Sequence, residues 1–246
     1  MKLDLQYVDP RFVELYDSSN PRGADTDFYI QLAVERNAKT IFDLGCGTGL
    51  LTRELAVAGR KVIGVDPALE MVKHAKRQPE ADRVTWVCGT AEVIANLNAD
   101  LAIMTGNVAQ VFLDDSEWLA TLDSLYQALR PDGCLAFESR NPLDRAWERW
   151  NRESTYQISD TGHGLLEEWL DVTSVQNGRV VFEGHNVFMQ TGERLIIKSE
   201  LSFRTQGEII ESLISSGFNV EQVFGDWKRG LLTEKSRAMI FIAKRV

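Results

Sequence analysis

Short apolar runs alternate with longer amphipathic stretches through the first half of the chain. The runs predict strands at 40–43, 61–66, 83–87, 100–104 and 134–138. The stretches predict helices at 50–58, 68–77 and 116–129. Strands that alternate with helices pair in parallel and are covered on both faces. The pattern therefore predicts a doubly wound α/β sheet, whose ligands bind beyond the carboxyl ends of the strands.

The pattern changes after residue 145. The segments 166–175, 180–189 and 195–203 look like antiparallel strands, and no helix separates them. Asn177-Gly178 is a strong hairpin signal. The sequence thus predicts a β-rich antiparallel insertion, or lid, after the fifth strand.

The two ends of the chain complete the core. Residues 1–25 predict a short amphipathic cap segment and a loop, and Asp25-Thr26-Asp27 is a candidate cap for a helix at 27–36. Near the other end, a capping box at 205–208 opens a helix to Ser216, and strands follow at about 219–224 and 237–243. We therefore expect a core made of 1–145 and 205–246, with the insertion at 146–204.

A glycine-rich loop lies between the first predicted strand and helix. Its sequence is Asp43-Leu44-Gly45-Cys46-Gly47-Thr48-Gly49. A dinucleotide fingerprint would need glycine where Leu50 stands, and the lysine of a phosphate-binding Walker loop is absent. Asp66 ends the second strand 21 residues after Gly45, a distance at which an acid accepts hydrogen bonds from ribose hydroxyls.

These features together resemble one family. The run 41–49 resembles motif I of the class I S-adenosylmethionine (SAM)-dependent methyltransferases, and Val65-Asp66-Pro67 with Met71 resembles their second motif. Residues 129–135 and Gly217-Phe218 resemble the entries to their fifth and sixth strands. The resemblance covers about 27–145 and 205–246, and it implies a seven-stranded, mostly parallel sheet whose last strand is antiparallel.

The resemblance also implies which residues hold SAM and its product S-adenosylhomocysteine. The methionine and ribose would lie on the loop, and Asp66 would hold the ribose hydroxyls. The adenine would lie beside Met71 and the turn after the third strand, and the sulfonium would lie near the fourth strand. The implied cofactor residues are Asp43, Gly45, Gly47, Gly49, Asp66, Pro67, Met71, Thr90, Ala91, Glu92, Thr105 and Gly106. Many members carry an acid where Thr90 stands, so the Thr90 hydroxyl, Glu92 or a backbone group would replace it. Simple core packing is the alternative for Met71, and a solvated helix position is the alternative for Glu92.

Methyl transfer needs little from the protein beyond placement, because the methyl of a sulfonium is already activated. A base is needed only to deprotonate the acceptor. Candidates for the acceptor side are Asn107 after the fourth strand, Arg140 after the fifth, and His185 in the insertion. Arg140 would bind a carboxylate or phosphate, or form a surface ion pair. His185 is the candidate neutral-pH base, with a purely structural role as the alternative.

The aromatic residues of the insertion allow two interpretations. They would form a cage for the acceptor, including a cationic amine, or a small core against the sheet. The small core is the favoured interpretation for most of them. The residues concerned are Trp147, Trp150, Tyr156, Trp169 and Phe182.

Charge and composition limit the classes of molecule that the protein is expected to bind. The net charge of −9 and the pI near 5.0 disfavour binding to nucleic acid, and they suit a small-molecule acceptor. The N-terminus resembles no signal peptide, and no apolar run is long enough to span a membrane. Three scattered cysteines and three scattered histidines support neither a disulfide framework nor a metal site. A reducing cytoplasm is the expected location.

Four functions remain in order of preference. The first is transfer of a methyl group from SAM to a nitrogen or oxygen of a small molecule. The second is an RNA or protein methyltransferase, with its substrate on the insertion. The third is a SAM-binding protein without catalysis. The fourth, a nicotinamide-dependent oxidoreductase, is disfavoured by Leu50.

Overall fold

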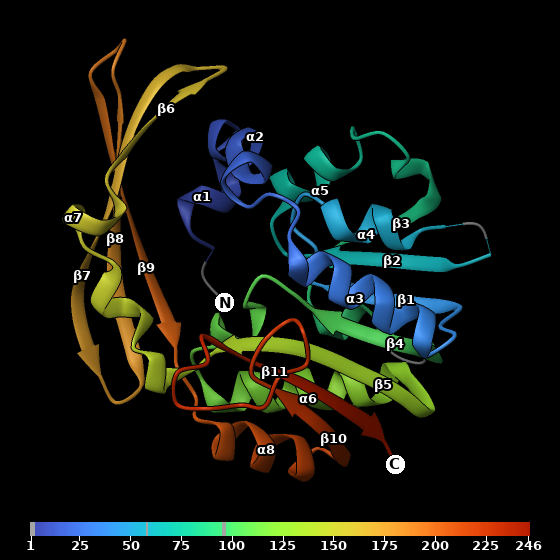
Figure 1. Cartoon of the computed structure of the whole chain (residues 1–246). Coiled ribbons are helices and arrows are strands. Elements are labelled where there is room, and N and C mark those ends of the chain that lie inside the picture. The colour runs from blue at the N-terminus through green and yellow to red at the C-terminus, as the bar shows by residue number, and fades with distance from the viewer. Residues whose placement is uncertain (1–2, 58, 95–96) are drawn as a thin grey trace.

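The computed structural model describes residues 3–57, 59–94 and 97–246. Its larger sheet has seven strands in the order β10-β11-β5-β4-β1-β2-β3 (Figure 1). These strands are β1 (Thr40–Leu44), β2 (Lys61–Asp66), β3 (Val84–Cys88), β4 (Ala99–Met104), β5 (Leu129–Arg140), β10 (Phe218–Phe224) and β11 (Ala238–Arg245). Strand β11 is antiparallel to both neighbours, while β1, β2, β3, β4 and β5 pair in parallel. The predicted fold class is confirmed, and the antiparallel last strand lies one place in from the edge of the sheet.

Helices cover both faces of this sheet. They are α3 (Ala24–Glu35), α4 (Leu50–Leu55), α5 (Leu69–Ala75), α6 (Asp115–Ala128) and α8 (Gln206–Ser215). Short 3-10 turns lie at Ala81–Arg83, Ala91–Ile94, Val108–Gln110, Pro142–Asp144 and Ala146–Arg149. Helices α6 and α8 pack on the face that carries Phe42, and α3 and α4 pack on the face that carries Ile41. Successive strand residues thus feed two separate apolar cores, as expected for a doubly wound sheet.

The predicted starts of two elements, helix α3 and strand β5, are wrong. Helix α3 begins at Ala24 with Gly23 as its N-cap, so the acidic run 25–27 occupies the first turn instead of capping it. Strand β5 begins at Leu129, although its pairing with β4 skips from Leu129 to Cys134, where the predicted strand began. The predicted end of α4 at 58 lies outside the described residues, and the helix itself ends at Leu55. The capping box of α8 at Thr205 and Glu208 is confirmed.

The insertion forms a second, four-stranded antiparallel sheet in the order β6-β7-β8-β9. Its strands are β6 (Gln157–Thr161), β7 (Gly164–Gln176), β8 (Arg179–Phe188) and β9 (Glu193–Ser202), preceded by α7 (Arg152–Thr155). Asn177 and Gly178 both have positive φ and join β7 to β8, so the predicted hairpin is confirmed. Strand β6 was not predicted, because its exposed positions carry no clear alternation.

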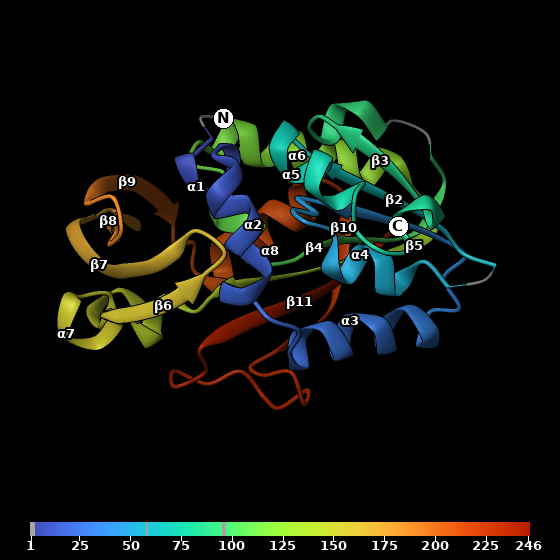
Figure 2. The ribbon, with the colours of Figure 1, turned by 90° about the horizontal axis from the view of Figure 1, so that it is seen from above.

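The N-terminal segment folds as two helices, α1 (Leu5–Val8) and α2 (Pro10–Ser19). Both figures of the ribbon place α2 between the four-stranded sheet and the larger sheet (Figures 1 and 2). Phe12 packs against Leu166 of the insertion, whereas Val13 packs against Met71 of α5. Helix α2 therefore packs on both parts of the molecule. No described helix is long and apolar enough to cross a membrane.

Candidate active site

The glycine loop adopts a conformation that excludes side chains. Gly45, Gly47 and Gly49 have φ values of 75°, 55° and 77°, a region that favours glycine. A Cβ on Gly45 would lie 2.4 Å from a methyl of Val108, and a Cβ on Gly49 would lie 2.2 Å from the ring of Trp86. The close spacing of the glycines is therefore a steric requirement of the fold.

Asp66 holds this loop from the next strand. Its Oδ2 accepts a hydrogen bond from the Gly47 N–H at 2.9 Å, and its Oδ1 accepts one from the Ala68 N–H at 2.8 Å. Burial raises the pKa of the carboxyl, and these two bonds act in the opposite direction. Each oxygen retains capacity for a further donor, so the carboxylate is able to accept from a diol as well.

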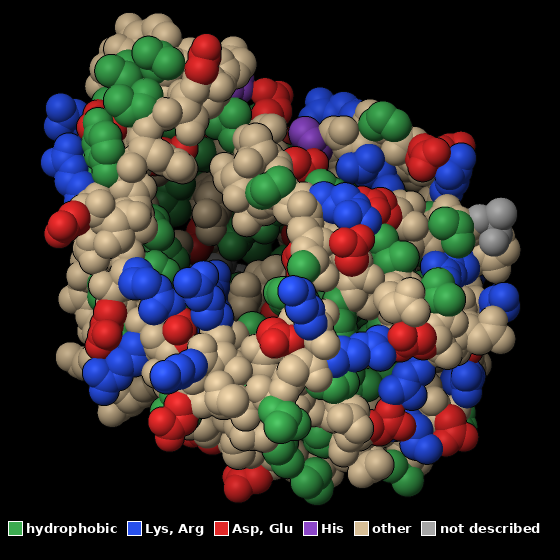
Figure 3. Space-filling view, in the orientation of Figure 1, with side chains coloured by type: hydrophobic (Ala, Val, Ile, Leu, Met, Phe, Trp, Pro, Cys, Tyr) green, Lys and Arg blue, Asp and Glu red, His purple; other side chains and the backbone are tan. Residues whose placement is uncertain are grey.

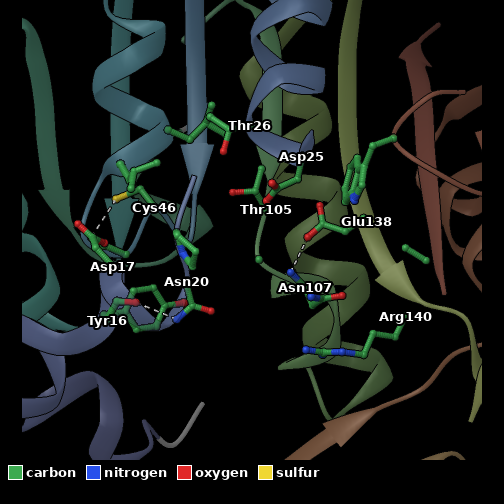
Figure 4. A pocket seen from close by; sticks show the side chains of 18 of the residues that line it. Tyr16, Asp17, Asn20, Asp25, Thr26, Cys46, Thr105, Asn107, Glu138 and Arg140 are labelled. Carbon is green, nitrogen blue, oxygen red and sulfur yellow. Dashed lines mark hydrogen bonds between the residues drawn. The ribbon is translucent and has the colours of Figure 1, made fainter. Parts of the chain in front are cut away.

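A cavity of about 500 Å³ opens at the carboxyl ends of β1, β4 and β5. We call it the first cavity. It brings together seven of the predicted residues, namely Asp43, Gly45, Gly47, Thr105, Gly106, Asn107 and Arg140. Figure 4 shows Tyr16 and Asn20 on one side of it, and Asn107 and Arg140 on the other.

The other predicted cofactor residues do not line the first cavity. Gly49 lies at the end of the loop, where it caps α4. Met71 is buried against Val13 and Ala68, which agrees with core packing. After β3, Thr90 and Glu92 are exposed and Ala91 is buried. At the end of β2, Asp66 is buried without lining the cavity, and Pro67 is half-buried. Their roles toward the cofactor stay predictions.

Asp43 is the most informative group in the first cavity. Its carboxylate is buried, Oδ2 accepts from the Thr52 hydroxyl at 2.6 Å, and Oδ1 has no hydrogen-bond partner. Burial raises its pKa to about 7. An unpaired buried oxygen is costly, and a cationic ligand would remove that cost. The amino and sulfonium groups of SAM have this charge, so the residues present fit SAM.

The loop after β4 is fixed by a buried carboxylate on β5. Glu138 accepts a hydrogen bond from the Asn107 backbone N–H at 2.6 Å and another from the Tyr29 hydroxyl. Asn107 has a φ of 62°, so this bond stabilises a turn that few non-glycine residues adopt. The network holds the segment 105–107 at the wall of the cavity. Its Tyr29 member lies on α3, and no sequence signal paired it with Glu138.

Arg140 stands beside this network without a carboxylate partner. Its Nη1 donates to Gln110 Oε1 at 2.9 Å, and its guanidinium lies 5.4 Å from the ring centre of Trp150. Burial lowers the pKa of Arg140. Glu138 acts on it electrostatically, but among the described residues no carboxylate lies within ion-pair distance of it. It is therefore able to bind an anionic group inside the cavity.

His185 is not brought together with Asn107 and Arg140. Its ring stacks on Trp169 with centroids 4.7 Å apart, and its Nε2 lies 3.5 Å from Asp171. Strand alternation puts its side chain on the face of the insertion opposite Asn186 and Phe188, which are buried toward α2. Trp147 and Trp150 both pack on Phe203, in agreement with a small core.

A second cavity of about 430 Å³ lies between α2 and the four-stranded sheet. Figure 3 shows the surface hollowed there, with hydrophobic side chains inside the hollow. Tyr16 and Asn20 line both cavities and so form their common wall. These residues were missed, because only the folded position of α2 brings them to the site. One bond that fixes this position is donated by the Thr48 hydroxyl to Asp17.

Within the described residues, no cluster of three His, Cys, Asp or Glu side chains is arranged to hold a metal ion.

The chain is similar to known methyltransferases in sequence and in fold. Residues 41–133 match the family model of a methyltransferase domain. A protein of Geobacillus sp. (strain WCH70) that is named a putative methyltransferase is 33% identical over 228 residues, which cover 85% of this chain and 86% of that protein. This chain belongs to the SAM-dependent methyltransferases.

Two further likenesses add detail. A malonyl-[acyl-carrier protein] O-methyltransferase of Pectobacterium atrosepticum is 31% identical over 64% of this chain, and the match spans 65% of that relative's length. An amino pentose methyltransferase from Micromonospora echinaspora, solved with SAM bound, superimposes with a TM-score of 0.72 over 94% of this chain and 97% of its own. At 18% identity, that likeness describes the fold. The cofactor of the family is SAM, as the loop and Asp66 predicted.

Proposed function

We propose that the protein transfers a methyl group from SAM to a nitrogen or oxygen of a small-molecule acceptor and releases S-adenosylhomocysteine. The observation that carries this proposal is the buried Oδ1 of Asp43, which lies beside the glycine loop without a hydrogen-bond partner and which a cationic ligand would satisfy. SAM supplies an electrophilic methyl group on its sulfonium.

On the cofactor side, the residues act by binding and orientation. Asp43 and the glycine loop would hold the methionine part, Asp66 the ribose hydroxyls, and Thr105 and Gly106 the neighbourhood of the sulfur. Met71, Pro67 and the turn 90–92 would border the adenine. Placing the methyl in line with an acceptor supplies most of the rate acceleration in such a reaction.

On the acceptor side, Asn107 and Arg140 line the first cavity and would face the space beyond the methyl group. Arg140 would bind an anionic part of the acceptor, and the Asn107 side chain would orient the nucleophile. His185 stays a candidate base, at the second cavity instead of the first. The acceptor would enter by the second cavity and pass the common wall at Tyr16 and Asn20.

The size and charge of the site support a small acceptor. Cavities of about 500 and 430 Å³ are in the range that holds small molecules. The net charge of −9 opposes a general affinity for nucleic acid. A relative named for an amino pentose and another named for a malonyl group on a carrier protein are consistent with this class.

Calorimetry with SAM and with NAD tests the cofactor. We expect SAM to bind and NAD not to bind, because Leu50 stands where the dinucleotide loop needs glycine. Binding of NAD without binding of SAM would refute the proposal.

Catalysis is tested by release of S-adenosylhomocysteine from libraries of amines, phenols and carboxylates. We expect turnover with at least one small molecule. SAM binding with turnover only on RNA or a protein, or with no turnover at all, would favour the second or third function instead.

A further inference from the structure

We propose that the methyl acceptor carries a protonated amine, and that Glu168 binds this amine in the second cavity. The inference rests on the proposed function only in naming the occupant as the methyl acceptor. The charge preference of the cavity stands by itself and is tested separately.

Glu168 is a half-buried carboxylate without a cation. It lies on β7, and strand alternation gives it the same face as Leu166, which packs against Phe12 of α2. Burial raises its pKa, while a hydrogen bond from the Gln157 side chain lowers it. In the described ranges, no Lys, Arg or His forms an ion pair with it. A carboxylate taken out of water without a counter-ion is costly, and a cationic ligand would offset that cost.

The neighbouring residue offers a direct contrast. Glu167 lies next to Glu168 on β7, and alternation points it to the opposite face. Its carboxylate pairs with Arg152 at 3.5 Å. Arg152 therefore neutralises Glu167 on one face of β7, whereas Glu168 on the other face has no cationic partner among the described residues.

The walls of the second cavity favour a cation further. Among its described lining residues there is no Lys or Arg, and Glu168 is the single carboxylate; the one lining histidine, His185, has its Nε2 3.5 Å from Asp171. The aromatic rings of Phe12, Tyr16 and Phe182 also line it. Aromatic faces attract cations, most strongly where water is excluded. A carboxylate with aromatic rings and amides around it thus fits an ammonium group attached to an apolar or sugar-sized body.

The position of the cavity links this group to the chemistry. Tyr16 and Asn20 form the common wall with the first cavity, where Asn107 and Arg140 lie. A molecule anchored by its amine at Glu168 would extend past Tyr16 toward the methyl group. Glu168 would then act as a specificity residue that sets the register of the acceptor.

The test uses the full chain saturated with S-adenosylhomocysteine and matched probe pairs that differ in one group. The pairs are phenethylamine and 2-phenylethanol, cyclohexylamine and cyclohexanol, and glucosamine and glucose. Binding is measured by calorimetry or saturation-transfer NMR for the wild type, for Glu168→Gln, and for Glu167→Gln as the matched control. Thermal unfolding of each variant establishes that it is folded.

We expect the wild type and Glu167→Gln to bind at least one amine about tenfold more tightly than its alcohol, the usual size of one charge-assisted contact. Glu168→Gln should abolish this preference. An amine preference that survives in Glu168→Gln, an equal affinity for alcohols, or no binding of any amine would overturn the inference. A failure of SAM binding or turnover would instead refute the proposed function, whatever the amines do.

Discussion

The two cavities of this methyltransferase share a wall but are built in different ways. The first is made at strand ends, where backbone groups of the glycine loop bond to Asp66 and the Asn107 turn bonds to Glu138. The second is made where an N-terminal helix meets an antiparallel sheet, and residues of both elements line it. We infer from this difference that local sequence and steric fit determine the first cavity, on the cofactor side. The acceptor side depends on segments that are distant in sequence.

The largest effect is expected from the glycine loop. Gly49→Ala should destabilise the protein by about 2–5 kcal/mol, because a left-handed alanine costs about 1–2 kcal/mol and the clash with Trp86 adds more. SAM affinity should fall with it. Gly59→Ala is the matched control, since Gly59 has a φ of 83° and open space around it. Chemical denaturation that showed equal losses for the two variants would contradict a steric role for the loop.

The next effect separates binding from stability. Asp66→Asn should weaken SAM binding by about 10–100-fold, as hydrogen bonds to a charged acceptor are lost. Asp100→Asn is the control, because the Asp100 carboxylate also accepts two backbone N–H bonds, from Lys39 and Thr40, near the start of β4. It should lower stability and leave SAM affinity unchanged in calorimetry. Unchanged SAM affinity in Asp66→Asn would remove that residue from the site.

A third effect is a pH dependence of SAM binding. The free protein holds the pKa of Asp43 at about 7 by burial, and a bound cation would lower it. SAM should therefore bind up to about tenfold more tightly at pH 8 than at pH 6 and release protons near pH 7. Calorimetry in buffers of different ionisation enthalpy measures that release. Asp43→Asn should abolish the dependence, and equal dependence in this variant would assign it to another group.

The smallest effect is expected at His185, which lines the second cavity and not the first. His185→Gln should change SAM affinity less than twofold and lower the free energy of unfolding by about 0.5–1.5 kcal/mol through loss of the stack on Trp169. A large loss of SAM affinity would show that the two cavities are not separate. A loss of turnover at unchanged affinities would support its predicted role as a base.

The same contrast explains what the sequence alone revealed. Strands, the glycine loop and Asp66 follow from short-range rules, because alternation, a steric need for glycine and a fixed loop-to-acid spacing are visible in consecutive residues. The seven-stranded sheet with its antiparallel last strand was implied by the family resemblance that these motifs carry, and it is confirmed. Strand β6 was missed, since an exposed edge strand needs no apolar alternation.

Most residues of the acceptor side could not be predicted from the sequence. Tyr16 enters the site because Phe12 and Val13 dock α2 between two separate cores. The pairing of Tyr29 with Glu138 joins residues 109 positions apart. Glu168 looks like its neighbour Glu167 in sequence, and only the face of β7 distinguishes a paired acid from an unpaired one.

One measurement tests the division between the cavities most directly. It is a crystal structure of the protein with S-adenosylhomocysteine and the amine that binds best. We predict the homocysteine amino group on Asp43 in the first cavity and the acceptor amine on Glu168 in the second, with the acceptor passing Tyr16. Both ligands in a single cavity, or an amine bound away from Glu168, would contradict the account.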